Sequence, residues 1–160
     1  MNDDPGSLGI ASPTSAVLTL RVLWGALLLG QVSLVVVILA MGEQRFQTDK
    51  MKDFVQGLFW LSWAFLAIVV PAGYFLRNQI YKRYWREQAI EPGAYVIGNL
   101  LLLTMLEGMA LFGWILALLG GRFLPTALPS FVAMGVQVIN FPTGAPLRPA
   151  PFDGSQPSEP

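Results

Sequence analysis

Four apolar stretches, each long enough to cross a bilayer, occupy most of this 160-residue chain. They cover residues about 22–41, 54–76, 94–120 and 123–141. A helix needs about 20 apolar residues to span the hydrocarbon core, and a backbone in lipid must satisfy its own hydrogen bonds. Only 12% of the residues are charged, against about 25% in ordinary soluble domains. The sequence therefore predicts an all-α fold, a four-helix transmembrane bundle, rather than a barrel of short alternating strands.

The residue types that the chain lacks exclude several function classes. It has no cysteine and no histidine, which removes thiol catalysis, thiolate metal sites and His-ligated haem. No nucleophile–base pair or metal-ligand cluster is apparent, so we expect neither an enzyme nor a metal or other cofactor. The formal net charge is zero and the cations lie only near the span boundaries, so we expect no nucleic-acid binding.

Loop charges predict the orientation. The N-terminal flank, the 77–91 loop and the C-terminal tail together hold six Lys or Arg residues, and the other side holds four. The positive-inside rule then places both termini in the cytoplasm. The N-terminus has no basic residue before Arg21, which does not fit a cleaved signal peptide, so we expect the first span to be retained.

Residues 1–141 are predicted to form the membrane domain, and residues 142–160 a separate tail. The tail has six prolines in 19 residues, a composition that predicts disorder. The loop "RNQIYKRYWREQAIE" has aromatic and basic residues on different sides of a helical projection, which predicts an interfacial helix at the headgroups. Pro71 is expected to kink or end the second span.

Glu107 lies near the centre of the third stretch, "LLLLTMLEGMALFGWILALLGG" at residues 100–121, where the bilayer midplane is expected. A central acidic residue costs about 2.5–3.5 kcal/mol on insertion scales, so a chain without a use for it should avoid it. Because burial disfavours the ionised form, Glu107 is a candidate proton- or cation-binding group. The other three spans contain no Lys, Arg or His to pair with it. The candidate polar neighbours are Gln31, Ser33, Ser62, Asn99, Thr104 and Gln137.

Small residues recur at spacings of four and three along the first and third stretches. Such stripes let helix backbones approach closely in lipid. The candidate helix-packing residues are Ala26, Gly30, Ala110, Gly113 and Ala117. The same two stretches align at an offset of 77 residues, with Gly30 opposite Glu107. This faint repeat favours an organisation as two duplicated helical hairpins.

The segment "MLEGMALFGWILALL" resembles the carboxylate-bearing helix of the proteolipid c subunits of rotary ATP synthases and ATPases. The resemblance is limited to the third stretch and its flank, and it implies that Glu107 is the cation-binding carboxylate. The second stretch is bulky and aromatic where hairpins of that family carry a glycine-rich helix. The patterns "RVLWGALLLGQ" and "LEGMALFG" more closely resemble a group of small uncharacterised four-helix bacterial membrane proteins. This second resemblance implies the bacterial inner (cytoplasmic) membrane and no particular activity.

Two functions of different classes follow, and the residues alone leave both open. One is a c-like proton- or cation-binding subunit, in which Glu107 exchanges its proton. The other is a structural or accessory subunit of a larger membrane complex, in which Glu107 hydrogen-bonds helices together. An independent transporter is a third possibility, although four short helices leave little room for a substrate unless several copies assemble. The expected partners are the lipid bilayer and either further copies of the chain or a larger complex.

Overall fold

The computed structural model describes residues 12–41, 49–86, 89–120 and 123–147, and these are mostly helical. Four helices have seven or more residues: α1 (Pro13–Met41), α2 (Asp49–Arg83), α3 (Pro92–Gly120) and α5 (Leu128–Ile139). The short elements are β1 (Trp85–Arg86), β2 (Ala89–Ile90), α4 (Phe123–Thr126) and the 3-10 turn η1 (Ala145–Leu147). Helices α1, α2 and α3 are long and apolar enough to cross a membrane, which supports the prediction of a helical membrane protein.

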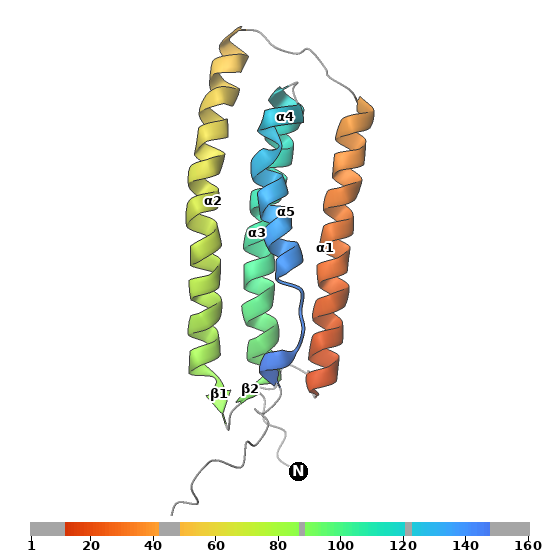
Figure 1. The fold of residues 1–160 in the computed structure, drawn as a ribbon, viewed down its shortest axis with the longest axis vertical. Coiled ribbons are helices and arrows are strands. Elements are labelled where there is room, and N and C mark those ends of the chain that lie inside the picture. The colour runs from red at the N-terminus through yellow and green to blue at the C-terminus, as the bar shows by residue number, and fades with distance from the viewer. Residues whose placement is uncertain (1–11, 42–48, 87–88, 121–122, 148–160) are drawn as a thin grey trace, which may run out of the picture.

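Helix α3 is the centre of the assembly. Figure 1 shows α1 and α2 on opposite sides of α3, with the shorter α5 lying along it. Half of the most apolar part of α3 is buried within the protein, against 11% for α1 and 17% for α2. We call the end that holds the start of α1, the β1–β2 hairpin and η1 the hairpin end, and the opposite end, where α3 stops at Gly120, the far end (Figure 1).

Helix α1 begins nine residues before the predicted span, at Pro13 rather than residue 22. Its added turns are part of the core at the hairpin end. Ala16 and Leu20 are fully buried there in a cluster with Tyr95 of α3 and Leu147 of η1. Burial of these side chains explains why the helix continues beyond the apolar run, because tertiary packing supplies most of a helix's stability.

Helix α2 also continues further than predicted. It runs through Pro71, which does not end it, and includes the residues up to Arg83 that were predicted to form an interfacial helix. The chain then turns through a short antiparallel hairpin in which Trp85 pairs with Ile90. The prediction of a separate interfacial helix is therefore wrong for the described part of this loop.

The fourth apolar stretch is not one helix over 123–141. Leu124 has an extended backbone (φ −103°, ψ 138°), as expected for a residue that precedes a proline. Helix α5 starts at Leu128, with Pro129 in its first turn, and ends at Ile139. The backbone N–H of Asn140 closes the last turn on the carbonyl of Val136. The helix is thus shorter than the predicted span at both ends.

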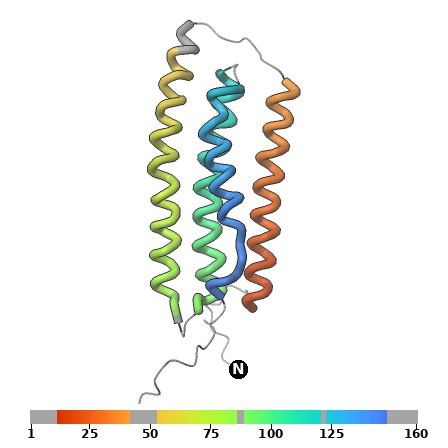
Figure 2. The backbone as a smooth tube through the Cα atoms, in the orientation of Figure 1, coloured from red at the N-terminus to blue at the C-terminus, as the bar shows by residue number. Residues whose placement is uncertain are grey.

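After α5 the chain continues as a non-helical segment to the hairpin end, visible in Figure 2 as the gently curved blue tube before the last turn. Gly144 adopts φ +77°, a conformation that glycine tolerates, and Leu147 is buried against the hairpin-end cluster. Residues 142–147 are therefore ordered and packed, contrary to the prediction of a disordered tail. The burial of Pro142 and Leu147 accounts for this difference. Residues 148–160 lie outside the described part of the chain.

Candidate functional site

Three helices each contribute one polar side chain to a cluster midway along α3. The cluster consists of Glu107 of α3, Gln31 of α1 and Gln137 of α5. The Gln31 Nε2 group donates a hydrogen bond to Glu107 Oε2 and another to Gln137 Oε1, the latter at 2.7 Å. Both glutamines are fully buried, and Glu107 is partly buried. We refer to these three residues as the carboxyl–amide cluster.

Close packing of α5 on α3 positions Gln137. Gly113 of α3 lies directly against Ser130 of α5, where a β-carbon would collide with the serine Oγ. The same hydroxyl donates to the carbonyl oxygen of Ala110 at 2.7 Å. The missing side chain at Gly113 therefore allows the two backbones to approach.

A narrow stripe on α1 positions Gln31. The buried residues of this helix, apart from Ala16, are Leu20, Gln31 and Ile38, whose spacings of 11 and 7 place them on one side of a helix. Ile38 belongs to the main apolar core. Trp24 on the same helix donates its indole N–H to the carbonyl oxygen of Gln137 at 2.9 Å. Helix α1 is thus connected to α5 by both a side-chain and a backbone hydrogen bond.

The chemistry of the cluster suits a carboxyl group that changes its protonation state. An ionised Glu107 accepts hydrogen bonds only, and the Gln31 amide supplies a donor. A protonated Glu107 has a donor of its own, and a half-turn of the Gln31 amide would present an acceptor oxygen to it. The Gln137 amide would turn with it, so that its Nε2 group donates to the Gln31 oxygen in place of the present bond between these amides. Amide oxygen and nitrogen atoms are close in size, so the exchange needs little space. No cationic side chain in the described residues contacts Glu107.

Two polar atoms of the cluster have no hydrogen-bond partner among the described residues. They are Gln31 Oε1 and Gln137 Nε2, and both are buried. Buried polar groups are almost always paired, either with protein or with ordered water. Gln31 Oε1 can therefore accept one more hydrogen bond and Gln137 Nε2 can donate one, and no described residue supplies the partner.

The other candidate neighbours of Glu107 lie elsewhere. Ser33 is exposed and Ser62 buried, and each hydroxyl bonds a carbonyl of its own helix. Asn99 lies nearer the hairpin end, where its amide donates to the Tyr81 hydroxyl at 2.5 Å. Thr104 is exposed. Of the polar residues proposed from the sequence, the structure brings only Gln31 and Gln137 into the cluster.

The candidate packing residues divide by helix. Ala110, Gly113 and Ala117 are buried on α3. Ala26 and Gly30 are exposed on α1, and a β-carbon at Gly30 would meet no atom within 4 Å. The packing face of α1 is therefore displaced by one residue, about 100°, from the predicted stripe, because Gln31 rather than Gly30 faces α3.

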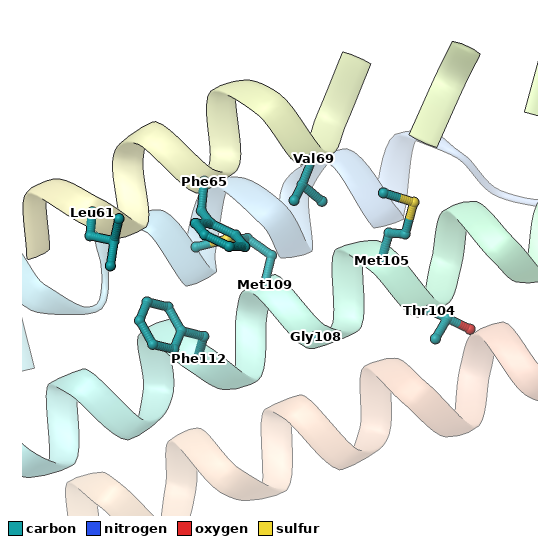
Figure 3. A pocket seen from close by; sticks show the side chains of 8 residues that line it. All are labelled: Leu61, Phe65, Val69, Thr104, Met105, Gly108, Met109 and Phe112. Atoms are coloured by element: carbon teal, nitrogen blue, oxygen red, sulfur yellow. The ribbon is translucent and has the colours of Figure 1, made fainter. Parts of the chain in front are cut away.

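An apolar groove of about 510 Å³ lies between α2 and α3, and neither Glu107 nor Gln31 is part of its lining. Figure 3 shows Leu61, Phe65 and Val69 of α2 pointing towards the residues of α3 that form the other wall. Thr104 is the only residue of the lining with a polar side chain, so the groove offers no group for acid–base or ion chemistry. The carboxyl–amide cluster is therefore the stronger candidate site.

A second group of polar side chains, which the sequence analysis did not predict, lies towards the hairpin end. Asn140, just after α5, accepts a hydrogen bond from Arg77 of α2 through its Oδ1 atom at 3.1 Å. Its amide donates to the Tyr74 hydroxyl. A signal was present in the sequence, because Gln137 and Asn140 are three residues apart and so share a face of a helix.

The described residues contain no group of three or more Asp, Glu, Cys or His side chains that could hold a metal ion. Comparison with protein-family models, with curated proteins and with solved structures finds no match to this chain. The assignment of a function therefore depends on the chemistry of the cluster.

Proposed function

We propose that this chain is a multi-pass membrane protein that binds a proton, or exchanges it for a cation, at Glu107, in the manner of a c-like subunit. The observation that carries the proposal is the carboxyl–amide cluster. The Glu107 carboxyl of α3 accepts a hydrogen bond from the Gln31 amide of α1, which also bonds Gln137 of α5, and no cationic side chain of the described residues contacts the carboxyl. Ionisable residues inside transmembrane segments are costly and usually mark ion pathways or proton relays. A glutamine at position 107 could hydrogen-bond the helices without the insertion cost of a carboxyl.

The proposed setting is a four-helix transmembrane bundle in the bacterial inner membrane. Its fourth passage consists of α4, α5 and the non-helical segment up to η1. Irregular backbone is tolerated at membrane depth where protein surrounds it. The described ends of the chain then lie on one side, and the excess of positive residues assigns the hairpin end to the cytoplasm.

We expect a lipid-soluble carbodiimide to label purified protein at Glu107. These reagents react with protonated carboxyls, so labelling should fall as the pH rises, and a competing cation should protect the site. The measurement is mass-spectrometric mapping of the modified residue in detergent, across a series of pH values and sodium concentrations. Protection by sodium would identify a cation site, and dependence on pH alone would identify a proton site.

Two variants make this test specific. Glu107→Gln should abolish the labelling, whereas Glu91→Gln, which removes an exposed carboxyl at the hairpin end, should leave it unchanged. Labelling of Glu107 that ignores both pH and sodium, or no labelling, would contradict the proposal. The accessory-subunit function would then be favoured, and Glu107→Gln should reduce co-purification with a partner complex.

A further inference from the structure

Among the described residues, a group of polar side chains lies between the cluster and the hairpin end. One turn beyond Gln137, Asn140 contacts both Arg77 and Tyr74. The Arg77 guanidinium lies over the Tyr74 ring at 4.8 Å and near the Tyr81 ring at 5.8 Å. A series of polar groups therefore leads from the middle of the membrane domain towards the hairpin end.

The series continues on α3. The Tyr81 hydroxyl accepts a hydrogen bond from Asn99, which lies eight residues before Glu107, or about 12 Å along the helix. The non-helical segment after α5 adds backbone polar groups at the same depth. The amide of Gly144 donates to the Tyr95 hydroxyl at 3.0 Å, and Arg21 donates to the carbonyl of Pro142 at 3.1 Å. Side chains from α1, α2 and α3 thus surround this part of the chain with hydrogen-bonding groups.

Three buried polar atoms on this side have no protein partner among the described residues. They are Gln31 Oε1 and Gln137 Nε2 in the cluster, and Arg77 Nε further along. Water molecules usually complete the hydrogen bonding of such atoms where the surroundings are polar. Together with Asn140, these atoms supply the donors and acceptors that a hydrated path needs.

The direction towards the far end is different. Trp114 is fully buried, stacks on Phe123 at 6.1 Å and contacts Phe131 edge-on at 4.9 Å. The Ser130 hydroxyl on this side is bonded to a helix carbonyl. Trp114 Nε1 is buried without a partner, but it is a single donor among aromatic rings and has no acceptor to continue a chain. These three rings form an aromatic plug.

We propose that Glu107 communicates with water at the hairpin end alone, along a polar route through Asn140, Arg77 and Tyr81, and that the aromatic plug closes the far end. One part of the inference rests on the proposed function: that the route carries a proton to or from Glu107. The route itself is a property of the packing and can be tested without any reaction at Glu107. A one-sided connection makes the protonation of Glu107 follow the pH of the compartment at the hairpin end.

The chain lacks cysteine, so single substitutions provide a direct test of water access. Asn140→Cys places a thiol on the route and Ser130→Cys places one beyond the cluster on the far side. Thr14→Cys and Met41→Cys, at exposed positions near the two ends of α1, report the two sides of the membrane. Each full-length variant is reconstituted into sealed vesicles and treated with a membrane-impermeant methanethiosulfonate on one side at a time.

We expect Asn140→Cys to be modified only from the side that modifies Thr14→Cys. Its rate should exceed that of Ser130→Cys by at least about tenfold, because the reactive thiolate forms where water reaches the thiol. Three results would overturn the route. Asn140→Cys could react from the side that modifies Met41→Cys, it could react from both sides, or it could react at the same rate as Ser130→Cys. If Asn140→Cys does not fold, Asn99→Cys tests the same route from α3, and its failure to react from the Thr14 side would be decisive.

The two proposals can fail separately. Adding Glu107→Gln to Asn140→Cys should leave thiol modification unchanged, because water access does not require the carboxyl. Loss of pH-dependent carbodiimide labelling with normal thiol modification would reject proton binding and keep the path. Normal pH-dependent carbodiimide labelling without the expected one-sided thiol modification would keep proton binding and reject the path.

Discussion

Gln31→Leu is expected to lower the free energy of unfolding by about 2 kcal/mol. The substitution removes both hydrogen bonds of the Gln31 amide and leaves the partly buried Glu107 carboxyl and the buried Gln137 Oε1 atom without this donor. Interhelical hydrogen bonds in membranes average only about 0.6 kcal/mol, so two lost bonds alone account for roughly half of this effect. The remainder comes from leaving polar groups without a partner. It is smaller than the cost of about 1–3 kcal/mol for each such group in water-soluble proteins, because Glu107 is only partly buried and the leucine also removes the unpaired Gln31 Oε1.

A double variant separates these contributions. Gln31→Leu with Glu107→Leu removes the donor and its main acceptor together, and should be more stable than Gln31→Leu alone, because no carboxyl is left unpaired. Ser33→Ala, on the exposed side of the same helix, is the matched control and should change little. The free energies can be measured by titrating the protein from mild detergent into denaturing detergent while following its helicity. A Gln31→Leu variant as stable as Ser33→Ala would contradict a role for the cluster in joining α1 to α3.

Gly113→Leu is expected to be at least as damaging, with a loss of about 3 kcal/mol, at the upper end of what overpacking of a core usually costs. A β-carbon at this position collides with Ser130 Oγ and lies 3.2 Å from the Ser130 backbone nitrogen. The hydroxyl can rotate, but the backbone of α5 cannot move without separating the two helices. Because α5 carries Gln137, separation would also disturb the carboxyl–amide cluster.

Smaller substitutions identify the cause. Gly113→Ala should be destabilising, and adding Ser130→Gly should recover part of the loss by removing the colliding hydroxyl. Gly30→Ala and Gly108→Ala are matched controls, since a β-carbon at either position meets nothing within 4 Å. Both should be neutral or stabilising by up to about 1 kcal/mol, because alanine is a better helix former than glycine. If Gly113→Ala behaves like these controls in thermal unfolding, the close approach of α3 and α5 is not important for stability.

The sequence predicted the helical class and three helices long and apolar enough to cross a membrane, because both depend on local composition. It did not predict which side of α1 faces inward. In a soluble protein the polar face of a helix identifies its exposed side. In lipid both the exposed and the packed side of a helix are apolar, so polarity does not identify the packed side. Small residues such as Gly30 suggested the wrong packing face of α1, and the single amide of Gln31 lies on the face that packs against α3.

The fourth stretch shows a second limit. Its hydropathy favoured a continuous helix, but the prolines at 125 and 129 and the end of α5 at Ile139 shorten it. The order of residues 142–147 depends on Leu147 packing against Tyr95 and the start of α1, contacts that join segments distant in the chain. Proline content alone gives no information about such contacts. The polar group around Arg77 was missed for the same reason.

The placement of α1 and α2 on opposite sides of α3 has a consequence for biogenesis. During synthesis the two outer helices enter the membrane before their common neighbour exists, so each must be stable in lipid alone. Helix α1 has the most apolar 18-residue stretch of the three long helices. This apolar surface offsets the free-energy cost of exposing the Gln31 amide to hydrocarbon before α3 is inserted. Helix α3, with its carboxyl, follows them. The amide that receives Glu107 is therefore already in the bilayer when the most costly residue of the chain arrives.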